Sequence, residues 1–193
     1  MENESLDPNS EYAVTKASAT QFCRHAAREF GIRTVTLRLY SVYGPYEEAA
    51  RLVPALIIRG LEKRLPPLVN PVVARDFVYI DDVCRAYIMA AMQPVKEPGA
   101  VFNVGTGIQT SIKEAVDVAR RLMNIKEEPH WGSMNDRSWD TNVWVADNRK
   151  ISTEIGWKPD LTFEQGFRKT LDWFRDNPDM LAAYQKMAED HLP

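Results

Sequence analysis

Residues 11–39, EYAVTKASATQFCRHAAREFGIRTVTLRL, pass from the periodicity of a helix to that of a strand. The first part predicts a helix over Pro8 to Phe30, because its interior is rich in alanine and Asp7 or Ser10 can cap its start. Gly31 is placed as a C-terminal glycine, and the residues after it alternate in the manner of a strand. A helix and a strand joined by one glycine form half of a βαβ unit, which indicates an α/β protein.

The two periodicities continue to alternate along the rest of the chain. Strands are predicted over residues 32–39, 76–80 and 101–104, with a loop over 41–48. Helices are predicted over residues 52–61, 81–92 and 177–193. Two more are expected where capping boxes occur, at Ser111 with Glu114 and at Thr162 with Gln165. The alternation predicts a mixed α/β domain without internal repeats.

Composition limits the class of protein. The chain has 193 residues, 45% of them hydrophobic and 26% charged, which is enough for one substantial domain or one domain with a small appendage. The net charge of -3 leaves no basic surface for nucleic acid or acidic membrane, so an anion must be held by local groups. The longest apolar runs are shorter than the roughly 20 residues that span a bilayer, and the start does not resemble a signal peptide. We therefore expect a cytoplasmic protein.

The two cysteines, Cys23 and Cys84, are expected to be reduced and structural. Together with His25, His130 and His191 they show no paired spacing typical of a metal site. No metal is predicted.

Tyr12 and Lys16 are four residues apart on the first predicted helix, so their side chains share one face. A free tyrosine has a pKa of about 10, and a neighbouring ammonium favours its phenolate. The pair therefore suits proton transfer. The same spacing also occurs by chance in helices, where a solvated lysine lies beside a half-buried ring, and the spacing alone favours that alternative.

An ordered set of sequence blocks follows this pair. They are LRLYSVYGP (37–45), RDFVYIDDV (75–83), FNVGTG (102–107), RSWD (137–140), VAD (145–147) and IGWKP (155–159). In this order the blocks resemble the extended short-chain dehydrogenase/reductase family of NAD-dependent nucleotide-sugar epimerases and dehydratases. The resemblance covers nearly the whole chain, and it implies a Rossmann-like fold with a small substrate-binding domain.

The resemblance implies roles for the residues around the cofactor. Tyr12 is similar to the family's catalytic tyrosine, and Lys16 to the partner that also holds the nicotinamide ribose of NAD. Tyr40 and Val42 match the segment that lies against the nicotinamide. Ser41 matches a substrate-phosphate contact, although the family usually has asparagine there.

The resemblance also implies two arginines for the nucleoside diphosphate, Arg75 and Arg137. Guanidinium groups bind phosphate oxygens in a bidentate manner, which supports this interpretation independently. A structural salt bridge from Arg75 to Asp76 or Asp81 is the alternative.

Three other patterns are interpreted structurally. Gly105-Thr106-Gly107 lacks the third glycine of a dinucleotide-binding loop and is expected to be a tight turn. Asp81 and Asp82 are expected to favour the positive end of a helix dipole. The five tryptophans are expected in core and edge packing: Trp131, Trp139, Trp144, Trp157 and Trp173.

The family's glycine-rich loop and cofactor-binding strands do not precede Tyr12. Residues 1–45 are therefore expected to be a remnant of the Rossmann-like domain. Residues 46–193 are expected to be mainly the nucleotide-sugar-binding region, with some elements returning to the first domain. The first hypothesis is a fragment of an epimerase or dehydratase that lacks activity alone. The alternatives are a non-catalytic binding or assembly module and a subunit complemented by a separate cofactor-binding chain. A homodimer through the helix Pro8 to Phe30 is expected.

Overall fold

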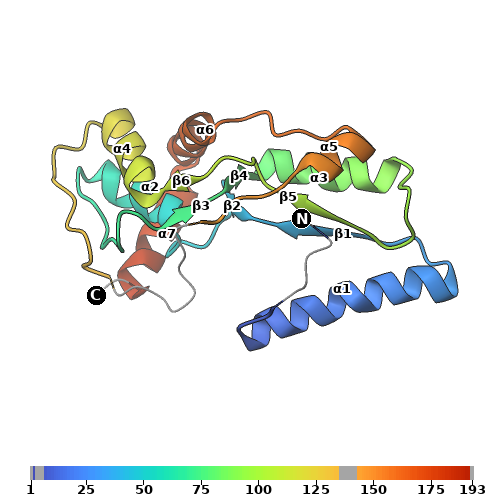
Figure 1. The fold of residues 1–193 in the computed structure, drawn as a ribbon. Helices are drawn as coiled ribbons and strands as arrows, with labels where there is room; N and C mark the ends of the chain where they lie inside the picture. The colour runs from blue at the N-terminus through green and yellow to red at the C-terminus, as the bar shows by residue number, and fades with distance from the viewer. Residues whose placement is uncertain (1, 3–6, 135–142, 192–193) are drawn as a thin grey trace.

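The computed structural model describes residue 2, residues 7–134 and residues 143–191 (Figure 1). Its centre is an extended segment made of β1 (Val35–Leu39) and β2 (Ser41–Tyr43), which pair with different strands. β1 pairs in parallel with β5 (Ala100–Val104), and β2 pairs in parallel with β4 (Phe77–Tyr79). Parallel pairs joined through helices are the arrangement of an α/β fold, so the expected fold class is found.

The change of partner occurs between Tyr40 and Ser41. The Tyr40 amide donates to the Val104 carbonyl at 3.0 Å, and the Ser41 amide donates to the Asp76 carbonyl at 3.0 Å. The prediction of a loop over residues 41–48 is therefore wrong for its first three residues, which form β2. A three-residue strand beside a Gly-Pro turn has little periodicity of its own, because a distant partner decides its conformation.

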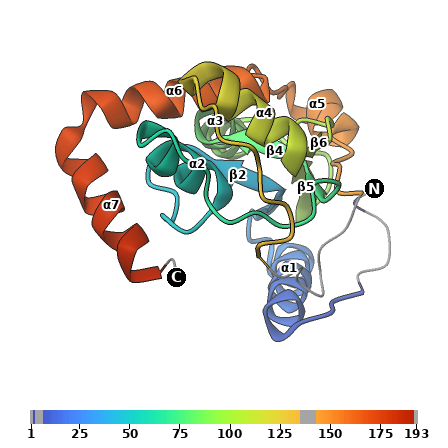
Figure 2. The same cartoon turned by 90° about the vertical axis from the view of Figure 1, so that its left-hand side faces the viewer.

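Helices cover both faces of this central layer. α1 (Glu11–Phe30) lies on one face, and α3 (Ile80–Met92) and α5 (Arg149–Ile155) lie on the other (Figures 1 and 2). Between the strands and α3 and α5 is a core that includes Phe102 and Trp157, both fully buried.

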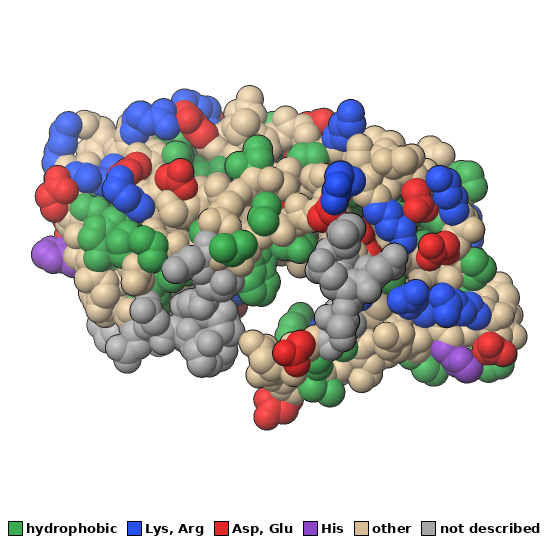
Figure 3. Space-filling view, in the orientation of Figure 1, with side chains coloured by type: hydrophobic (Ala, Val, Ile, Leu, Met, Phe, Trp, Pro, Cys, Tyr) green, Lys and Arg blue, Asp and Glu red, His purple; other side chains and the backbone are tan. Residues whose placement is uncertain are grey.

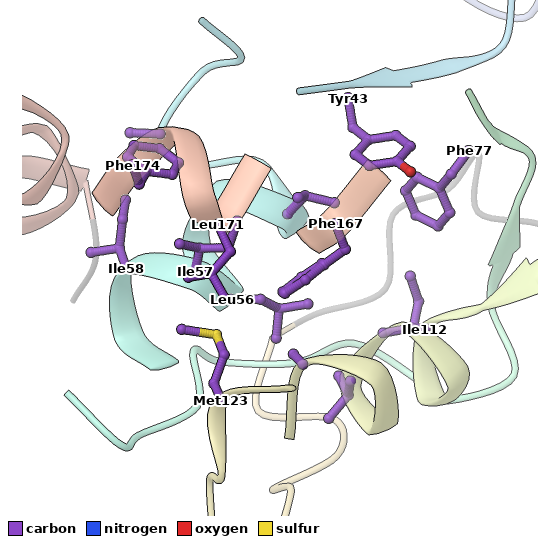
Figure 4. Packing of buried hydrophobic residues seen from close by; sticks show 14 of the residues in the cluster. Tyr43, Leu56, Ile57, Ile58, Phe77, Ile112, Met123, Phe167, Leu171 and Phe174 are labelled. Atoms are coloured by element: carbon purple, nitrogen blue, oxygen red, sulfur yellow. The ribbon is translucent and has the colours of Figure 1, made fainter. Parts of the chain in front are cut away.

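A second core lies beyond β2 and β4. It is surrounded by α2 (Leu52–Leu61), α4 (Ile112–Met123), α6 (Phe163–Asp176) and α7 (Pro178–His191). Figure 4 shows Leu56, Phe167 and Leu171 packed at its centre. A short antiparallel pair, β3 (Ala74–Arg75) with β6 (Thr110–Ser111), lies between the two cores.

Local signals set the ends of the helices. Ser10, not Asp7, caps α1 by accepting from the Ala13 amide at 3.2 Å, so the helix begins at Glu11 and not at Pro8. Gly31 ends it with φ of 65°, a conformation that suits glycine. Both capping boxes, Ser111 with Glu114 and Thr162 with Gln165, are confirmed.

α1 is buried on only part of its surface. Thr20, Ala26 and Ala27 are buried, whereas Phe22 is 70% exposed and Phe30 is 67% exposed. Large apolar side chains on this helix thus face solvent.

Candidate active site

The fold brings the first turn of α1 to the carboxyl end of β1. At about 1.5 Å per residue, the helix carries Tyr12 roughly 28 Å back from Gly31. At about 3.3 Å per residue, the following strand carries the chain roughly 20 Å in the opposite direction, to Tyr40. Figure 1 shows the start of α1 on the same side of the molecule as this end of β1. Ligands of open α/β sheets bind at such carboxyl ends.

Tyr12 and Lys16 lie together on the surface of α1. The Lys16 Nζ atom is 5.4 Å from the centroid of the Tyr12 ring, which is within the range of a cation–π contact. The Tyr12 side chain is 72% exposed. The predicted catalytic pair is therefore assembled by one helix turn and is open to solvent.

Tyr40 lies in a small cluster of side chains just after β1. Its ring meets the ring of Trp144 edge to face, with centroids 6.4 Å apart. Both residues line a hollow of about 320 Å³, together with Leu39, Val143 and Val145. Figure 3 shows the molecule hollowed between the start of α1 and the rest of the body.

Ser41 and Val42 have different surroundings, although they are adjacent to Tyr40. Ser41 is the first residue of β2 and is paired with Phe77. The Val42 side chain packs against the core beneath α3. Tyr40 therefore lines the hollow, whereas the Val42 side chain is directed into the core.

Arg75 approaches the same cluster from β3. The Cζ atom of its guanidinium is 5.4 Å from the centroid of a Trp144 ring, and its Nη1 donates to the Ala74 carbonyl at 2.8 Å. Arg75, Trp144 and Tyr40 are thus brought together, although they are far apart in the sequence. Arg137, the other predicted phosphate ligand, lies outside the described residues.

The carboxylate of Asp76, which is fully buried, organises the backbone beneath this cluster. It accepts from the Thr106 amide at 2.7 Å, the Thr106 hydroxyl at 2.6 Å, the Gly107 amide at 2.9 Å and the Ala146 amide at 2.9 Å. Asp76 therefore acts as an acceptor for three backbone amides and one hydroxyl. The sequence signal for this role was an acidic residue directly before the apolar run FVYI, because a carboxylate that is buried there needs hydrogen-bond donors.

The turn over Gly105-Thr106-Gly107 is confirmed. A Cβ atom on Gly105 would lie 2.7 Å from Asp76 Oδ2, and Gly107 has φ of 74°. Gly105 is thus required by its close approach to Asp76, and Gly107 by its positive φ.

Asp82 does more than favour a helix dipole. Its buried carboxylate accepts from the Asp160 amide at 3.1 Å and pairs with Arg85 at 2.9 Å. The Trp157 indole donates to the Asp82 carbonyl at 2.9 Å. Asp82 and Trp157 therefore fix α3 to the segment before α6, and the expectation of a role at the dipole alone was incomplete.

The remaining expectations have mixed outcomes. Cys23 and Cys84 are free thiols, as expected; Cys23 is partly buried and Cys84 is exposed. Trp157 is in the core, whereas Trp144 lies at the candidate site and Trp139 lies outside the described residues. In the described part of the chain, no helix is long and apolar enough to cross a membrane. The same residues contain no cluster of three or more His, Cys, Asp or Glu side chains able to hold a metal ion.

Comparison with known proteins shows the family of this chain. The family model described as "NAD dependent epimerase/dehydratase family" matches residues 1–105. The chain belongs to this family. A dTDP-glucose 4,6-dehydratase of Escherichia coli is 31% identical to it over 95% of the chain and 54% of the relative. The chain thus spans about half the length of the curated relatives it matches.

Solved structures of epimerases and dehydratases have the same fold. A dTDP-glucose 4,6-dehydratase from Bacillus anthracis, in complex with NAD, superimposes with a TM-score of 0.84 at 25% identity. That match covers 95% of this chain and 58% of the other. A UDP-glucose 4-epimerase from Thermotoga maritima, with UDP-glucose, gives a TM-score of 0.78 at 26% identity, covering 92% and 60%. The Rossmann-like α/β fold of an extended short-chain dehydrogenase is therefore established for this family member.

Proposed function

We propose that this chain carries the proton-transfer pair and part of the substrate site of an epimerase or dehydratase acting on a nucleoside-diphosphate sugar. The observation that carries the proposal is the contact of Tyr12 with Lys16 at the start of α1, on the side of the molecule where β1 ends and where Tyr40, Trp144 and Arg75 lie together. A proton-transfer pair and a guanidinium at one end of a parallel sheet suit an anionic sugar substrate.

In the proposed reaction, the Tyr12 oxygen takes a proton from a sugar hydroxyl. The Lys16 ammonium stabilises the phenolate and can donate to ribose hydroxyls. These groups fit the nicotinamide end of NAD, because one helix turn presents a phenol and an ammonium together. NAD, when bound, supplies the chemistry of hydride acceptance and return. We propose that the nicotinamide lies against Tyr40 and against the main chain of Val42.

The diphosphate is proposed to bind Arg75 and Arg137, with Ser41 contributing a hydroxyl. Guanidinium groups suit this target because each offers several donors in a fixed plane. This chain is proposed to have no turnover alone. Tyr12 is 72% exposed, and water around the reacting oxygen weakens the electrostatic interactions on which catalysis depends.

The proposed division of the chain follows its two cores. The core under α3 and α5 includes β1 and β5 and corresponds to the Rossmann-like part, to which residues beyond 45 return. The core between α2, α4, α6 and α7 corresponds to the substrate-binding part.

One observation favours a second candidate function. The exposed Phe22 and Phe30 on α1 suit burial against another polypeptide. A second copy of this chain would give the expected homodimer, and a separate cofactor-binding chain would give a complemented enzyme. A non-catalytic binding or assembly module would use the same surface without turnover.

Calorimetric titration with UDP-glucose and dTDP-glucose tests the substrate proposal. We expect saturable binding of at least one, weakened about tenfold or more by Arg75→Ala and by Arg137→Ala, since charge-assisted hydrogen bonds contribute about 1.5–3 kcal/mol each. Arg28→Ala is the matched control, because Arg28 is an exposed arginine near the other end of α1. Absence of binding, or equal affinity in all four proteins, would contradict the proposal.

A further inference from the structure

The side chain of Trp144 lies against two residues of the candidate site. Its ring is 5.4 Å from the Arg75 guanidinium carbon, and it meets the Tyr40 ring edge to face. The indole is nevertheless 40% exposed, at the rim of the hollow. An indole that serves only the core is normally more deeply buried, as Trp157 is in this protein.

The backbone around Trp144 is fixed, although residues 143–148 form neither helix nor strand. The Trp144 amide donates to the Gln109 side chain at 3.1 Å. Two residues later, the Ala146 amide donates to the buried Asp76 carboxylate at 2.9 Å. The Asn148 side chain then donates to the Gly105 carbonyl at 3.0 Å. Three anchors within five residues hold the backbone segment that carries the indole.

Asp76 also links this segment to Arg75 through the chain itself. Arg75 precedes Asp76 directly, and the Asp76 carboxylate binds both the turn at Thr106 and the segment that carries Trp144. The base of the arginine and the platform for its guanidinium are therefore positioned by the same buried group.

We infer that Trp144 is a positioning residue, which fixes the plane of the Arg75 guanidinium for a diphosphate group. The inference rests on the proposed function, in which Arg75 binds that group. Arginine side chains lose considerable rotamer freedom on binding, and a flat aromatic partner reduces that loss by holding the guanidinium in advance. A planar guanidinium held in this way can meet phosphate oxygens in a bidentate geometry.

The experiment measures the affinity of the full chain for UDP and for inorganic pyrophosphate by calorimetry. Trp144→Leu keeps an apolar side chain but removes the aromatic face, whereas Trp144→Phe keeps a smaller face. We expect Trp144→Leu to lower the affinity for both ligands by about the same factor, roughly fivefold to tenfold. Trp144→Phe should recover most of that loss, which a merely structural defect would not explain.

A double-mutant cycle tests whether Trp144 acts through Arg75. We expect Arg75→Ala with Trp144→Leu to bind UDP no more weakly than Arg75→Ala alone, because the tryptophan has nothing left to orient. Thermal unfolding of each variant identifies any that fail to fold, and for these Trp144→Phe in the Arg75→Ala background gives the same comparison.

The other outcomes overturn the inference in distinguishable ways. Additive losses in the cycle would show that Trp144 acts independently of Arg75. Loss of UDP affinity without loss of pyrophosphate affinity would place the indole against the base. If Arg75→Ala weakens UDP binding but Trp144→Leu does not, only this inference fails. If Arg75→Ala changes neither ligand, the proposed function of Arg75 fails as well.

Discussion

The Tyr43 side chain occupies the space beside the backbone of Gly166. Its hydroxyl donates to the Phe163 carbonyl at 3.0 Å, in the first turn of α6. A Cβ atom on Gly166 would lie 2.7 Å from Tyr43 Cζ and 2.9 Å from Tyr79 Cδ2. Gly166 therefore allows α6 to dock on β2, and Figure 4 shows Tyr43 directed toward this helix. The contact joins β2, which begins next to Tyr40 of the candidate site, to the second core.

Gly166→Ala should destabilise the fold, because tyrosine rings on two strands cannot move far within a packed core. We expect a loss of about 2–3 kcal/mol in the free energy of unfolding, measured by urea denaturation. Tyr43→Phe removes the hydroxyl and its hydrogen bond at a cost of about 1 kcal/mol. Combined with Gly166→Ala it should cost less than the sum of the two single changes. Strict additivity would contradict the described contact.

Tyr12→Phe should lower the turnover of any assembly containing this chain that has turnover. The expected loss in kcat is about 10²- to 10⁴-fold, the range for removal of a general acid or base. Tyr87→Phe, on the exposed surface of α3, is the matched control and should leave the rate unchanged. A retained rate with Tyr12→Phe would remove this residue from the proton transfer.

Glu47 should make the stability of the protein depend on pH. Burial raises the pKa of this carboxyl to about 8, although Arg51 opposes the shift. Its side chain is 15% exposed, and within the described chain its Oε2 atom is buried without a hydrogen-bond partner. The other charged or titratable groups around it are Glu48, in the same segment, Tyr43, on β2, and Tyr184, on α7.

The direction follows from proton binding. Between the ordinary pKa of 4.5 and about 8, the folded protein holds a proton that the unfolded chain releases. The free energy of unfolding should therefore fall as pH rises through this window, by up to about 1.4 kcal/mol per pH unit. Urea denaturation from pH 5 to about 8.5 measures it. Glu47→Gln should remove this slope, and Glu29→Gln, on the exposed surface of α1, should keep it. Equal slopes in both variants would rule out Glu47 as the source.

Phe22→Asp should prevent self-association if α1 is the dimer interface. We expect light scattering of the unmodified chain at micromolar concentration to give twice the monomer mass, and of Phe22→Asp to give the monomer mass. Ile88→Asp places the same charge at an exposed apolar position of α3 and should remain dimeric. A monomeric parent chain would favour the alternative of a separate cofactor-binding partner.

Local patterns in the sequence predicted much of this fold, and contacts between distant residues account for most of what they missed. α1 and its neighbour β1 were predicted because Ser10, the alanine-rich interior and Gly31 act within a few residues. β2 was not, since pairing with β4 alone makes Ser41–Tyr43 a strand.

The same distinction applies to the candidate site. Tyr12 and Lys16 were found because one helix turn brings them together. The contact of Trp144 with Arg75 joins residues almost 70 positions apart, through a segment fixed by Asp76. No spacing in the sequence encodes such a contact, so Trp144 was assigned to packing.

Among the described residues, β1 is paired along one edge only, with β5. The Tyr40 amide points to β5, so by the alternation of a strand the amides of Leu37 and Leu39 point to the other edge. These two amides should exchange with deuterium much faster than their neighbours Thr36 and Arg38. An association through α1 would leave them fast, whereas a strand added by another polypeptide would slow them. Two backbone protons of β1 can thus distinguish a helix-mediated dimer from completion of the sheet.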